Sequence, residues 1–460
     1  MMRAITAVAL VLLAGCDRSF VADPPIVESS LDTQLRASFN QWGAMPIGAV
    51  PAQNPALVSL GRSLFFDKVL SGNRDVSCGT CHDVTALSAM DGLSLSVGTG
   101  GSGVANQRTL GTGRSFVPRN APSLMNTGLG FFYTLWDGRV NEGFGFGPGQ
   151  TGTFQAPPGV VFPAGLTNIV AAQAMLPVLN RVEMRGTAGD RDVFGNLNEL
   201  AQLGDSPPEI WRGVMNRVLA IQEYASKFAA AYPGLPAGAL GFQHAANAIA
   251  AFQLATFTKH DSPFDRYLAH DNRALTEEQK RGGILFFGKA RCASCHSGAL
   301  LGGQQFANVG IPQIGPGVGS GAPLDLGRGE ILPKNQGGDF YQFAFRVPAL
   351  RNVELTAPYG HDGAYRTLEN VVRHYTNPDS AYRAYDVSQL DPELRGSFHG
   401  DNATIAAVMK NLDARVRQGI RMTPEEQRQI VAFLKSLTDD SARNLASAIP
   451  TSVPSGLPVR

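Results

Sequence analysis

The chain reads "LGRSLFFDKVLSGNRDVSCGTCH" from Leu60 to His82 and "RGGILFFGKARCASCH" from Arg281 to His296. In both stretches an apolar segment ends in a Phe-Phe pair, a loop follows, and the stretch closes on Cys-x-x-Cys-His. The apolar segments are predicted to be helices whose phenylalanines pack in a core. The repeat therefore predicts two related units, one in each half of the chain.

Three kinds of chemistry use cysteine pairs of this spacing. Disulfides form in oxidising compartments, two pairs can hold zinc, and Cys-x-x-Cys-His attaches c-type haem. In the haem case the cysteines form thioethers to the porphyrin, and the adjacent histidine binds the iron. A histidine directly after both pairs favours two haem c groups over the other two chemistries. The predicted attachment and ligand residues are Cys78, Cys81, His82, Cys292, Cys295 and His296.

The composition limits the other classes of function. The chain has 460 residues, enough for two or three domains, and a formal net charge of +1. Its basic residues form no run or stripe, which argues against nucleic-acid binding. The 52 glycines and 29 prolines predict long irregular loops between modest helices. Two such loops are expected at Gly98–Gly113 and Val140–Gly165.

The N-terminus resembles a bacterial export signal. Arg3 precedes the apolar run "AITAVALVLLAG", which is too short to span a bilayer, and the run ends in the lipoprotein-like box "LLAGC". This pattern predicts a signal peptide over residues 1–16, lipidation of Cys16, and a tether over residues 17–50. An ordinary signal peptide is the alternative. The mature protein is expected in the bacterial periplasm, held at a membrane by its lipid anchor alone.

The remaining chain divides at the polar segment "KHDSPFDRYLAHDN". We expect a first haem domain over residues 51–260, a second over 261–440, and a flexible tail over 441–460. The predicted fold class is all-α, with two cytochrome c-like haem domains and long irregular loops. Helices are expected at Ile210–Ala231, at Phe242–Thr258, after the capping box that Thr276 opens, and at Met422–Leu437 with Thr423 as N-cap.

From Leu57 to Leu437 the chain resembles the di-haem cytochrome c peroxidase family, which includes MauG. The resemblance rests on the two haem stretches and on "PRNAPSL", "LWDGR", "NRVEM", "DSPFDRYL" and "RVPALRNVELTAPYGHDG". It implies two helical haem domains. The first haem would react with hydrogen peroxide, and the second would transfer electrons.

The resemblance also implies roles for single residues. The tryptophan of "LWDGR" would relay electrons between the haems, and the glutamate of "NRVEM" would be the acid above the peroxide, with a nearby glutamine. A calcium ion would be held largely by carbonyl oxygens between the domains. The alternatives are a packed core tryptophan, a surface glutamate and ordinary turns. The residues are Trp136, Glu183 and Gln173 for catalysis, and Asn120, Thr356 and Pro358 for calcium.

In one respect the first haem site departs from typical members. They close the resting first haem with a histidine in a stretch like "SVGHG", whereas this chain has "SVGTG" with Thr99 at that place. No histidine occurs between His82 and His244. The first iron is therefore expected to lack that second ligand.

The second haem site departs as well. In typical members a methionine fourteen residues after the histidine of "PYxHDG" binds the second iron. Here that histidine is His361, and the residue at this spacing is Tyr375. Met409 and Met422 are too far along the chain, and His374 lies about 100° away around a helix. We expect Tyr375 to ligate the iron, the alternative being that it only packs against the haem. An anionic phenolate would lower the potential of that haem.

These departures are the MauG pattern. The leading interpretation is a peroxide-dependent oxidase that shares oxidising equivalents between two haems and oxidises a protein or a small aromatic donor. A cytochrome c peroxidase that uses a small redox protein as donor is the second interpretation, and a non-catalytic electron-transfer cytochrome is the third. Ala290 stands where MauG has its exit tryptophan, so the electron route or the substrate is expected to differ.

Overall fold

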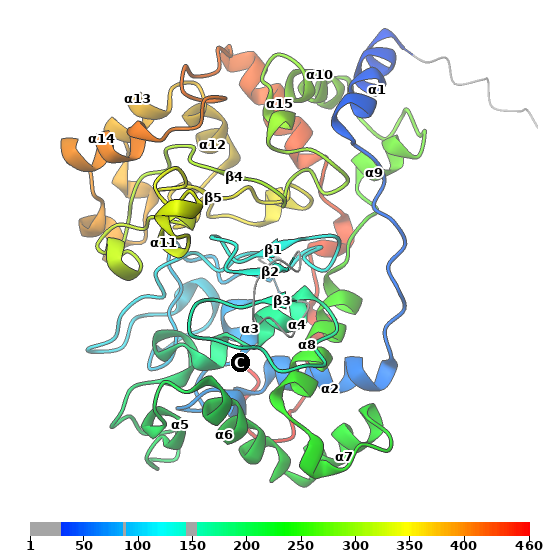
Figure 1. Ribbon diagram of the computed structural model, residues 1–460. Helices are drawn as coiled ribbons and strands as arrows, with labels where there is room; N and C mark the ends of the chain where they lie inside the picture. Colours follow the sequence, from blue (N-terminus) through cyan, green and yellow to red (C-terminus); the bar gives the residue numbers. More distant parts are fainter. Residues whose placement is uncertain (1–28, 86–88, 144–153) are drawn as a thin grey trace, which may run out of the picture.

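The structure is a computed structural model that describes residues 29–85, 89–143 and 154–460. The predicted signal peptide and Cys16 lie outside the described residues. Figure 1 shows two groups of helices, one above the other, with short strands between them. The helices are α1 Ser30–Trp42, α2 Pro55–Phe66, α3 Cys78–Cys81, α4 Ile169–Ala174, α5 Glu199–Gln202, α6 Pro207–Leu219, α7 Gln222–Ala231, α8 Phe242–Phe257, α9 Pro263–Leu268, α10 Glu277–Phe287, α11 Arg328–Ile331, α12 Leu368–His374, α13 Pro378–Arg383, α14 Asn402–Lys410 and α15 Pro424–Lys435.

One large core cluster lies in the lower group of Figure 1 and is built around α2 and α8. Phe65 of α2 contacts Phe252 and Phe257, with ring centroids 5.2 and 5.8 Å apart. The two helices touch closely at Gly61, where an added Cβ would lie 1.8 Å from the carbonyl oxygen of Ala248. Only glycine fits at this crossing.

The second large cluster lies in the upper group and repeats this arrangement with α10 and α15. Phe286 and Phe287 contact Phe433, with ring centroids 5.2 and 5.9 Å apart. Gly282 stands four residues before Phe286, as Gly61 stands before Phe65. A Cβ on Gly282 would lie 1.9 Å from the carbonyl oxygen of Gln429. The sequence repeat therefore corresponds to two helix pairs that close on a glycine in the same way.

Short strands lie between the two groups, so the expectation of an all-α chain is too simple. β1 Tyr133–Thr134, β2 Val140–Glu142 and β3 Phe154–Gln155 form an antiparallel sheet. β4 Phe306–Ala307 pairs with β5 Phe345–Arg346. The molecule is nevertheless helix-rich, and much of the remaining chain is irregular. No helix among the described residues has the length and apolar character needed to cross a membrane.

Part of the predicted tether is folded. Helix α1 starts at a capping box, in which Ser29 accepts from the backbone N–H of Asp32. It packs on the second cluster through Leu35 and Phe39. Residues 29–50 are therefore not a free linker. The few apolar residues of this segment do not predict a helix by themselves, because their burial depends on a helix far along the chain.

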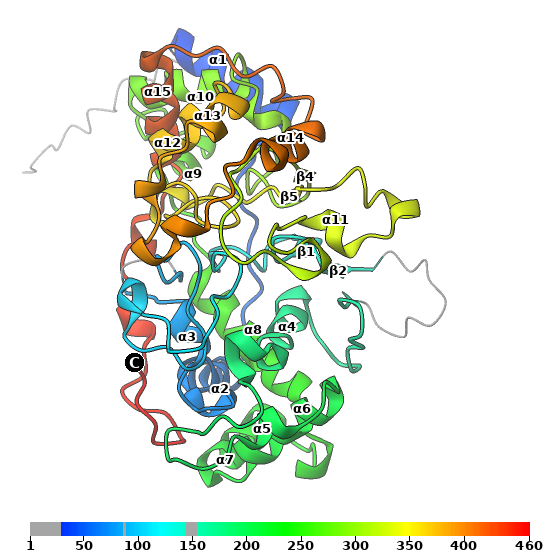
Figure 2. The ribbon, with the colours of Figure 1, turned by 90° about the vertical axis from the view of Figure 1, so that its left-hand side faces the viewer.

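The C-terminal segment also differs from the flexible tail that was expected. It returns to the lower group of helices and runs beside α2 and α3 (Figures 1 and 2). Leu445, Val453 and Leu457 join the first core cluster. Arg62 of α2 donates to the carbonyl oxygens of Ala448 and Ile449 at 2.7 and 2.8 Å. The apolar residues of this segment have no helical spacing, but they are buried against the first core cluster.

Candidate functional site

The two Cys-x-x-Cys-His motifs form equivalent tight turns. The first is helix α3, and the second is a 3₁₀ turn over Cys292–Ser294. In each, the histidine N–H donates to the carbonyl oxygen of the first cysteine, at 2.9 Å from His82 to Cys78 and 2.9 Å from His296 to Cys292. All four cysteines are free thiols, not disulfides.

Both histidines are held in the tautomer that a metal ligand needs. Nδ1 of His82 donates to the carbonyl oxygen of Ala89 at 2.9 Å, and Nδ1 of His296 donates to that of Leu301 at 3.1 Å. A carbonyl only accepts, so the proton sits on Nδ1 and the lone pair of Nε2 is free for iron. Burial lowers the pKa of both imidazoles, that of His296 to about 4, which keeps them neutral.

These features fit covalent haem and do not fit structural zinc. No group of three or more His, Cys, Asp or Glu side chains that could hold a metal ion occurs among the described residues. Each motif instead offers two thiols that can form thioethers to a porphyrin and one imidazole nitrogen that can bind its iron, as c-type haem requires.

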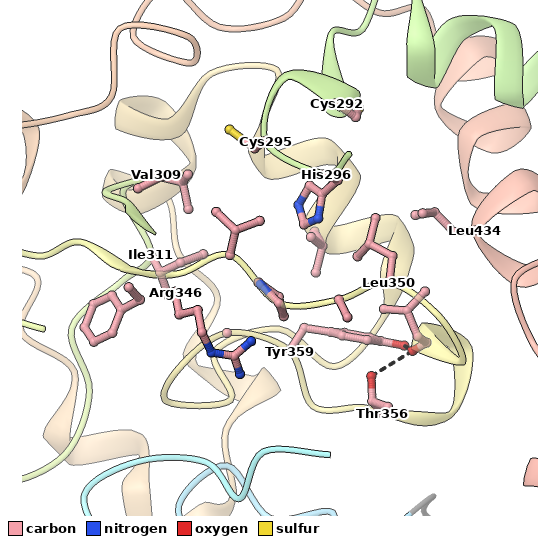
Figure 3. A pocket seen from close by; sticks show the side chains of 18 of the residues that line it. Cys292, Cys295, His296, Val309, Ile311, Arg346, Leu350, Thr356, Tyr359 and Leu434 are labelled. Atoms are coloured by element: carbon pink, nitrogen blue, oxygen red, sulfur yellow. Dashed lines mark hydrogen bonds between the residues drawn. The ribbon is translucent and has the colours of Figure 1, made fainter. Parts of the chain in front are cut away.

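The second motif opens on a large cavity with a mostly apolar wall. Figure 3 shows the side chain of His296 pointing into this cavity, with Val309, Ile311 and Leu350 around it. An apolar wall beside two thiols and a free imidazole nitrogen suits a porphyrin. The sequence-predicted residues that line this cavity are Cys292, Cys295, His296, Tyr375, Trp136, Asn120, Thr356 and Pro358.

Tyr375 reaches the cavity from the C-terminal end of α12. The N-cap of this helix is Thr367, and Tyr375 is its C-cap. The backbone carbonyl of Tyr375 accepts from the N–H of Ile420 at 2.9 Å, which fixes the helix end. Burial, together with the neighbouring thiols of Cys295 and Cys292, raises the pKa of the Tyr375 phenol. The phenol therefore stays protonated unless a cation stabilises its anion.

His374 is not available as a rival ligand. Its Nε2 donates to the carbonyl oxygen of Val309 at 2.7 Å, and its Nδ1 accepts from the hydroxyl of Tyr365 at 2.8 Å. Both ring nitrogens are used, and the side chain is only 1% exposed.

The two methionines differ from one another. Met409 packs against a separate small cluster that includes Tyr382 and Val408. Met422, however, lines the cavity together with Tyr375 and His296. The family's ligand spacing predicts that Met422 is too far along the chain to bind the iron. The turn before α15 nevertheless brings its thioether to the cavity wall.

Trp136 lies where segments from the two helix groups meet. Its indole Nε1 donates to the carbonyl oxygen of Asn120 at 2.8 Å. Its own carbonyl oxygen accepts from the N–H of Arg346 in β5 at 2.7 Å. The tryptophan is thus fixed on one side by its own half of the chain and on the other by the second half.

A buried chain of charges runs beside Trp136. Arg119 donates to Asp137 at 2.6 Å, and to Asp325 at 2.6 and 2.8 Å. Asp137 also accepts from Nε of Arg139 at 2.9 Å, and these arginines hold the pKa of its carboxyl well below the usual range. Removing one partner of such a buried pair typically costs about 3–5 kcal/mol. This network ties Asp325 of the second half to the loop that carries Trp136.

Glu183 faces the first haem-attachment turn. It lies in a π-helical turn, Arg181–Arg185, capped by Asn180. Burial raises the pKa of its carboxyl to about 7, against an opposing effect of Arg139. Burial raises the pKa of the Cys78 and Cys81 thiols, and the charge of Glu183 raises both further.

Gln173, the neighbour that the resemblance implies, lies half-buried on α4. Among the described residues no hydrogen bond joins its side chain to Glu183. The two residues lie on separate elements.

Thr99 occupies a fixed position next to Glu183. Its Oγ1 donates to the carboxylate of Asp75 at 2.9 Å, and its N–H donates to the carbonyl oxygen of Glu183 at 3.0 Å. The side chain is 3% exposed. A buried threonine whose hydroxyl is already used thus stands where typical members carry the closing histidine.

The three residues suggested for calcium all line the cavity. The amide nitrogen Nδ2 of Asn120 donates to the carbonyl oxygen of Leu93 at 2.8 Å, but its buried Oδ1 has no hydrogen-bond partner. Thr356 is fixed nearby by a 3.0 Å bond from its hydroxyl to the carbonyl oxygen of Val353, seen in Figure 3. An unpaired amide oxygen suits a hard cation.

Comparison with known proteins identifies the chain's relatives. The family model described as di-haem cytochrome c peroxidase matches residues 55–273. The methylamine utilization protein MauG of Methylorubrum extorquens is 30% identical over 416 residues, which is 90% of this chain and 88% of that protein. The chain belongs to the di-haem cytochrome c peroxidase family. The cytochrome c551 peroxidase of Pseudomonas aeruginosa is 29% identical over 395 residues, covering 85% and 82% of the two chains.

Solved structures agree with this assignment. A MauG-like protein associated with microbial copper homeostasis covers 89% of this chain and 97% of its own, with a TM-score of 0.57 and 25% identity. The diheme peroxidase BthA from Burkholderia thailandensis shares the fold, with a TM-score of 0.56 and 20% identity over 86% of this chain and 92% of its own.

Family membership confirms several predictions. As a di-haem cytochrome c peroxidase, the chain is a di-haem peroxidase-like oxidoreductase with two c-type haems. Peroxide is the substrate class, and a redox donor completes the reaction. Haem replaces disulfide and zinc as the use of the paired cysteines.

Proposed function

We propose that this chain is a MauG-like peroxide-dependent oxidase that shares oxidising equivalents between its two haems and withdraws electrons from a protein or a small aromatic donor. The observation that carries the proposal is the position of Tyr375, which lines the same cavity as His296. The neighbouring His374 does not compete as a ligand, because both of its ring nitrogens are engaged in hydrogen bonds.

At the first site, His82 would hold the iron and the Cys78 and Cys81 thiols would hold the porphyrin edge. The haem supplies the redox chemistry of O–O cleavage when it is bound. Glu183 would accept the proton from the inner peroxide oxygen and return it to the outer oxygen, which leaves as water. A carboxyl whose pKa lies about 7 can do both near neutral pH.

Thr99 would leave the first iron without a ligand at the place where typical members carry a histidine. Its hydroxyl is bonded to Asp75, and no histidine follows His82 before His244. Peroxide would therefore find an open position next to Glu183 without prior reduction of the protein.

At the second site, His296 and Tyr375, which line the same cavity, would hold the haem iron. Burial opposes ionisation of the phenol, so the iron must supply the charge that stabilises the phenolate. A hard anionic ligand favours oxidised iron and would let this haem hold an oxidising equivalent. Trp136, fixed by hydrogen bonds to both halves, would carry electrons between the sites.

Two further assignments accompany this proposal. A calcium ion would bind Asn120, Thr356 and Pro358, with the unpaired Oδ1 of Asn120 among its ligands. The "LLAGC" box would anchor the protein through a lipid on Cys16, on the periplasmic side of a bacterial membrane.

A cytochrome c peroxidase that removes peroxide with a small redox protein is the second candidate. One observation favours it: Met422 borders the same cavity as Tyr375. A methionine ligand raises a haem potential and would make the second haem an electron store.

Redox titration of the holoprotein decides between these ligands. With Tyr375 as ligand, Tyr375→Met should raise the second midpoint potential, and the matched variant Met422→Leu should leave it unchanged. The ferric protein should also contain one high-spin haem by electron paramagnetic resonance and react with peroxide directly. If Met422→Leu alone shifts the potential, the second candidate replaces the first.

A further inference from the structure

Arg346 is a buried cation on the wall of the second haem cavity. It lies in β5, is 7% exposed, and follows the "FAF" segment of the chain. Figure 3 shows its guanidinium below the ring of His296, among the side chains that line the cavity. No role follows for it from the family motifs discussed above.

The guanidinium of Arg346 has no anionic partner. Its Nε donates to the carbonyl oxygen of Leu135 at 3.1 Å, and its guanidinium carbon Cζ lies 5.1 Å from the ring centroid of Phe131. Nη1 is buried without any hydrogen-bond partner. Burial alone lowers the pKa of the guanidinium to about 10, and no nearby carboxylate offsets this effect.

Other buried arginines of the described chain are compensated. Arg119 pairs with Asp137 and Asp325, and Arg351, which lines the same cavity, pairs with Asp265 at 2.8 Å. Arg108 has no carboxylate but donates from all three of its nitrogens to backbone carbonyl oxygens. Arg346 differs from these arginines because neither a carboxylate nor a full set of carbonyl oxygens compensates its charge. A buried charge left uncompensated in this way costs several kcal/mol.

An anion held in the cavity would suit the buried Nη1 of Arg346. A haem brings two propionate carboxylates, and a carboxylate matches the planar fork of a guanidinium. We propose that Arg346 binds a propionate of the second haem. This inference rests on a haem in the second cavity, which family membership supplies, and not on whether Tyr375 is its ligand.

The same residue connects that haem to the inter-haem tryptophan. The N–H of Arg346 donates to the carbonyl oxygen of Trp136, and its Nε donates to that of Leu135 directly before it. Arg346 would therefore link a propionate bound at Nη1 to the segment that carries Trp136 through its own hydrogen bonds. Arg346 is a positioning residue for the second haem and for Trp136 together.

Its charge also acts on the iron. A nearby positive charge favours the reduced state, which carries one positive charge fewer, and so raises the haem potential. Arg346→Gln keeps a hydrogen-bonding side chain but removes the charge. We expect the ferrous-to-ferric ratio of the second haem at a fixed ambient potential to fall about tenfold, a shift of about 59 mV for a one-electron couple.

The test uses holoprotein with both haems, without peroxide or donor, so that a wrong assignment of the oxidised substrate leaves the result unaffected. Potentials of the second haem are measured by spectroelectrochemistry between pH 5 and 9, and the propionate bending mode by resonance Raman. Arg328→Gln is the matched control, because Arg328 lies over the ring of Phe306 in the paired strand and does not line the cavity.

Arg346→Gln should lower the potential, move the propionate mode and make the potential depend on pH as the freed propionate titrates. Arg346→Lys should restore most of the potential, and Arg328→Gln should change none of these readouts. An unchanged potential and propionate mode in Arg346→Gln would overturn the proposal. If that variant does not fold, Arg346→Lys decides, because a point charge in place of the planar guanidinium fork should still shift the propionate mode even where the potential is restored. An unshifted mode in Arg346→Lys would then overturn the proposal equally.

Discussion

The rate of reaction with peroxide should depend on one half-buried carboxyl, that of Glu183. Burial raises the pKa of Glu183 to about 7, from an ordinary value of 4.5. As a base, Glu183 acts in its ionised form, so the rate should be constant at high pH and fall as pH drops through about 7. At pH 5 about one carboxyl in a hundred is ionised, so the rate should be about a hundredfold below its plateau.

Stopped-flow mixing of the ferric holoprotein with excess peroxide measures this rate from pH 5 to 9. Glu183→Gln keeps the size of the side chain and cannot take a proton. Its rate should be at least about a hundredfold below the wild-type plateau and should not vary with pH. Glu209→Gln is the control, because Glu209 is an exposed carboxyl on α6 and should leave the profile intact.

Two results would refute this reasoning. A wild-type rate that is flat from pH 5 to 8 would mean that no group with a pKa near 7 moves the proton. A Glu183→Gln profile that still falls below pH 7 would assign the titration to another residue. Haem content of each variant, measured as the pyridine haemochrome, separates these outcomes from loss of the cofactor.

Three other substitutions test the calcium site and the repeated helix crossing. Asn120→Ala removes the unpaired Oδ1, so calcium affinity measured by titration calorimetry of chelator-treated holoprotein should fall at least tenfold, and unchanged binding would place the ion elsewhere. Gly61→Ala and Gly282→Ala each force a Cβ to within 2 Å of a backbone oxygen, so each should lower the free energy of unfolding by roughly 1–3 kcal/mol or more, whereas Gly238→Ala, which meets nothing within 4 Å, should not.

Much of the fold was predictable because local signals and the repeat agree. The helix expected at Phe242–Thr258 is α8, Phe242–Phe257. The Thr276 capping box opens α10, and Thr423 caps α15. Caps and apolar periodicity depend on a few neighbouring residues, so sequence alone reveals them.

The errors concern packing between distant segments. The helix expected over Ile210–Ala231 is two helices, α6 and α7, because the chain turns at Ala220 and Ile221. Helix α1 and the C-terminal segment carry too few apolar residues to be recognised as folded without their partners. Tertiary contacts, which the sequence does not display, decide all three cases.

The candidate site divides in the same way. The motif residues of both haem turns follow from their short-range spacing, whereas Tyr375 could be named only because the family resemblance supplies its spacing from His361. Met422 and Arg346 could not, since each reaches the cavity from a loop or strand whose position depends on the whole fold. An arginine in "FAFRVPAL", between apolar neighbours, was the one available signal of a buried charge.

The buried ion pairs beside Trp136 contribute more to fixed geometry than to stability. Replacing a buried ion-pair network with apolar side chains is often neutral or stabilising, so the Arg119 pairs with Asp137 and Asp325 are weak contributors to folding energy. Their effect is directional: paired guanidinium and carboxylate groups hold defined distances, where apolar contacts would tolerate sliding. Because Asp137 directly follows Trp136, the pairs fix the indole relative to the second half of the chain. Electron transfer between two haems depends steeply on such distances, and that dependence gives a physical reason for charges to be buried at this junction.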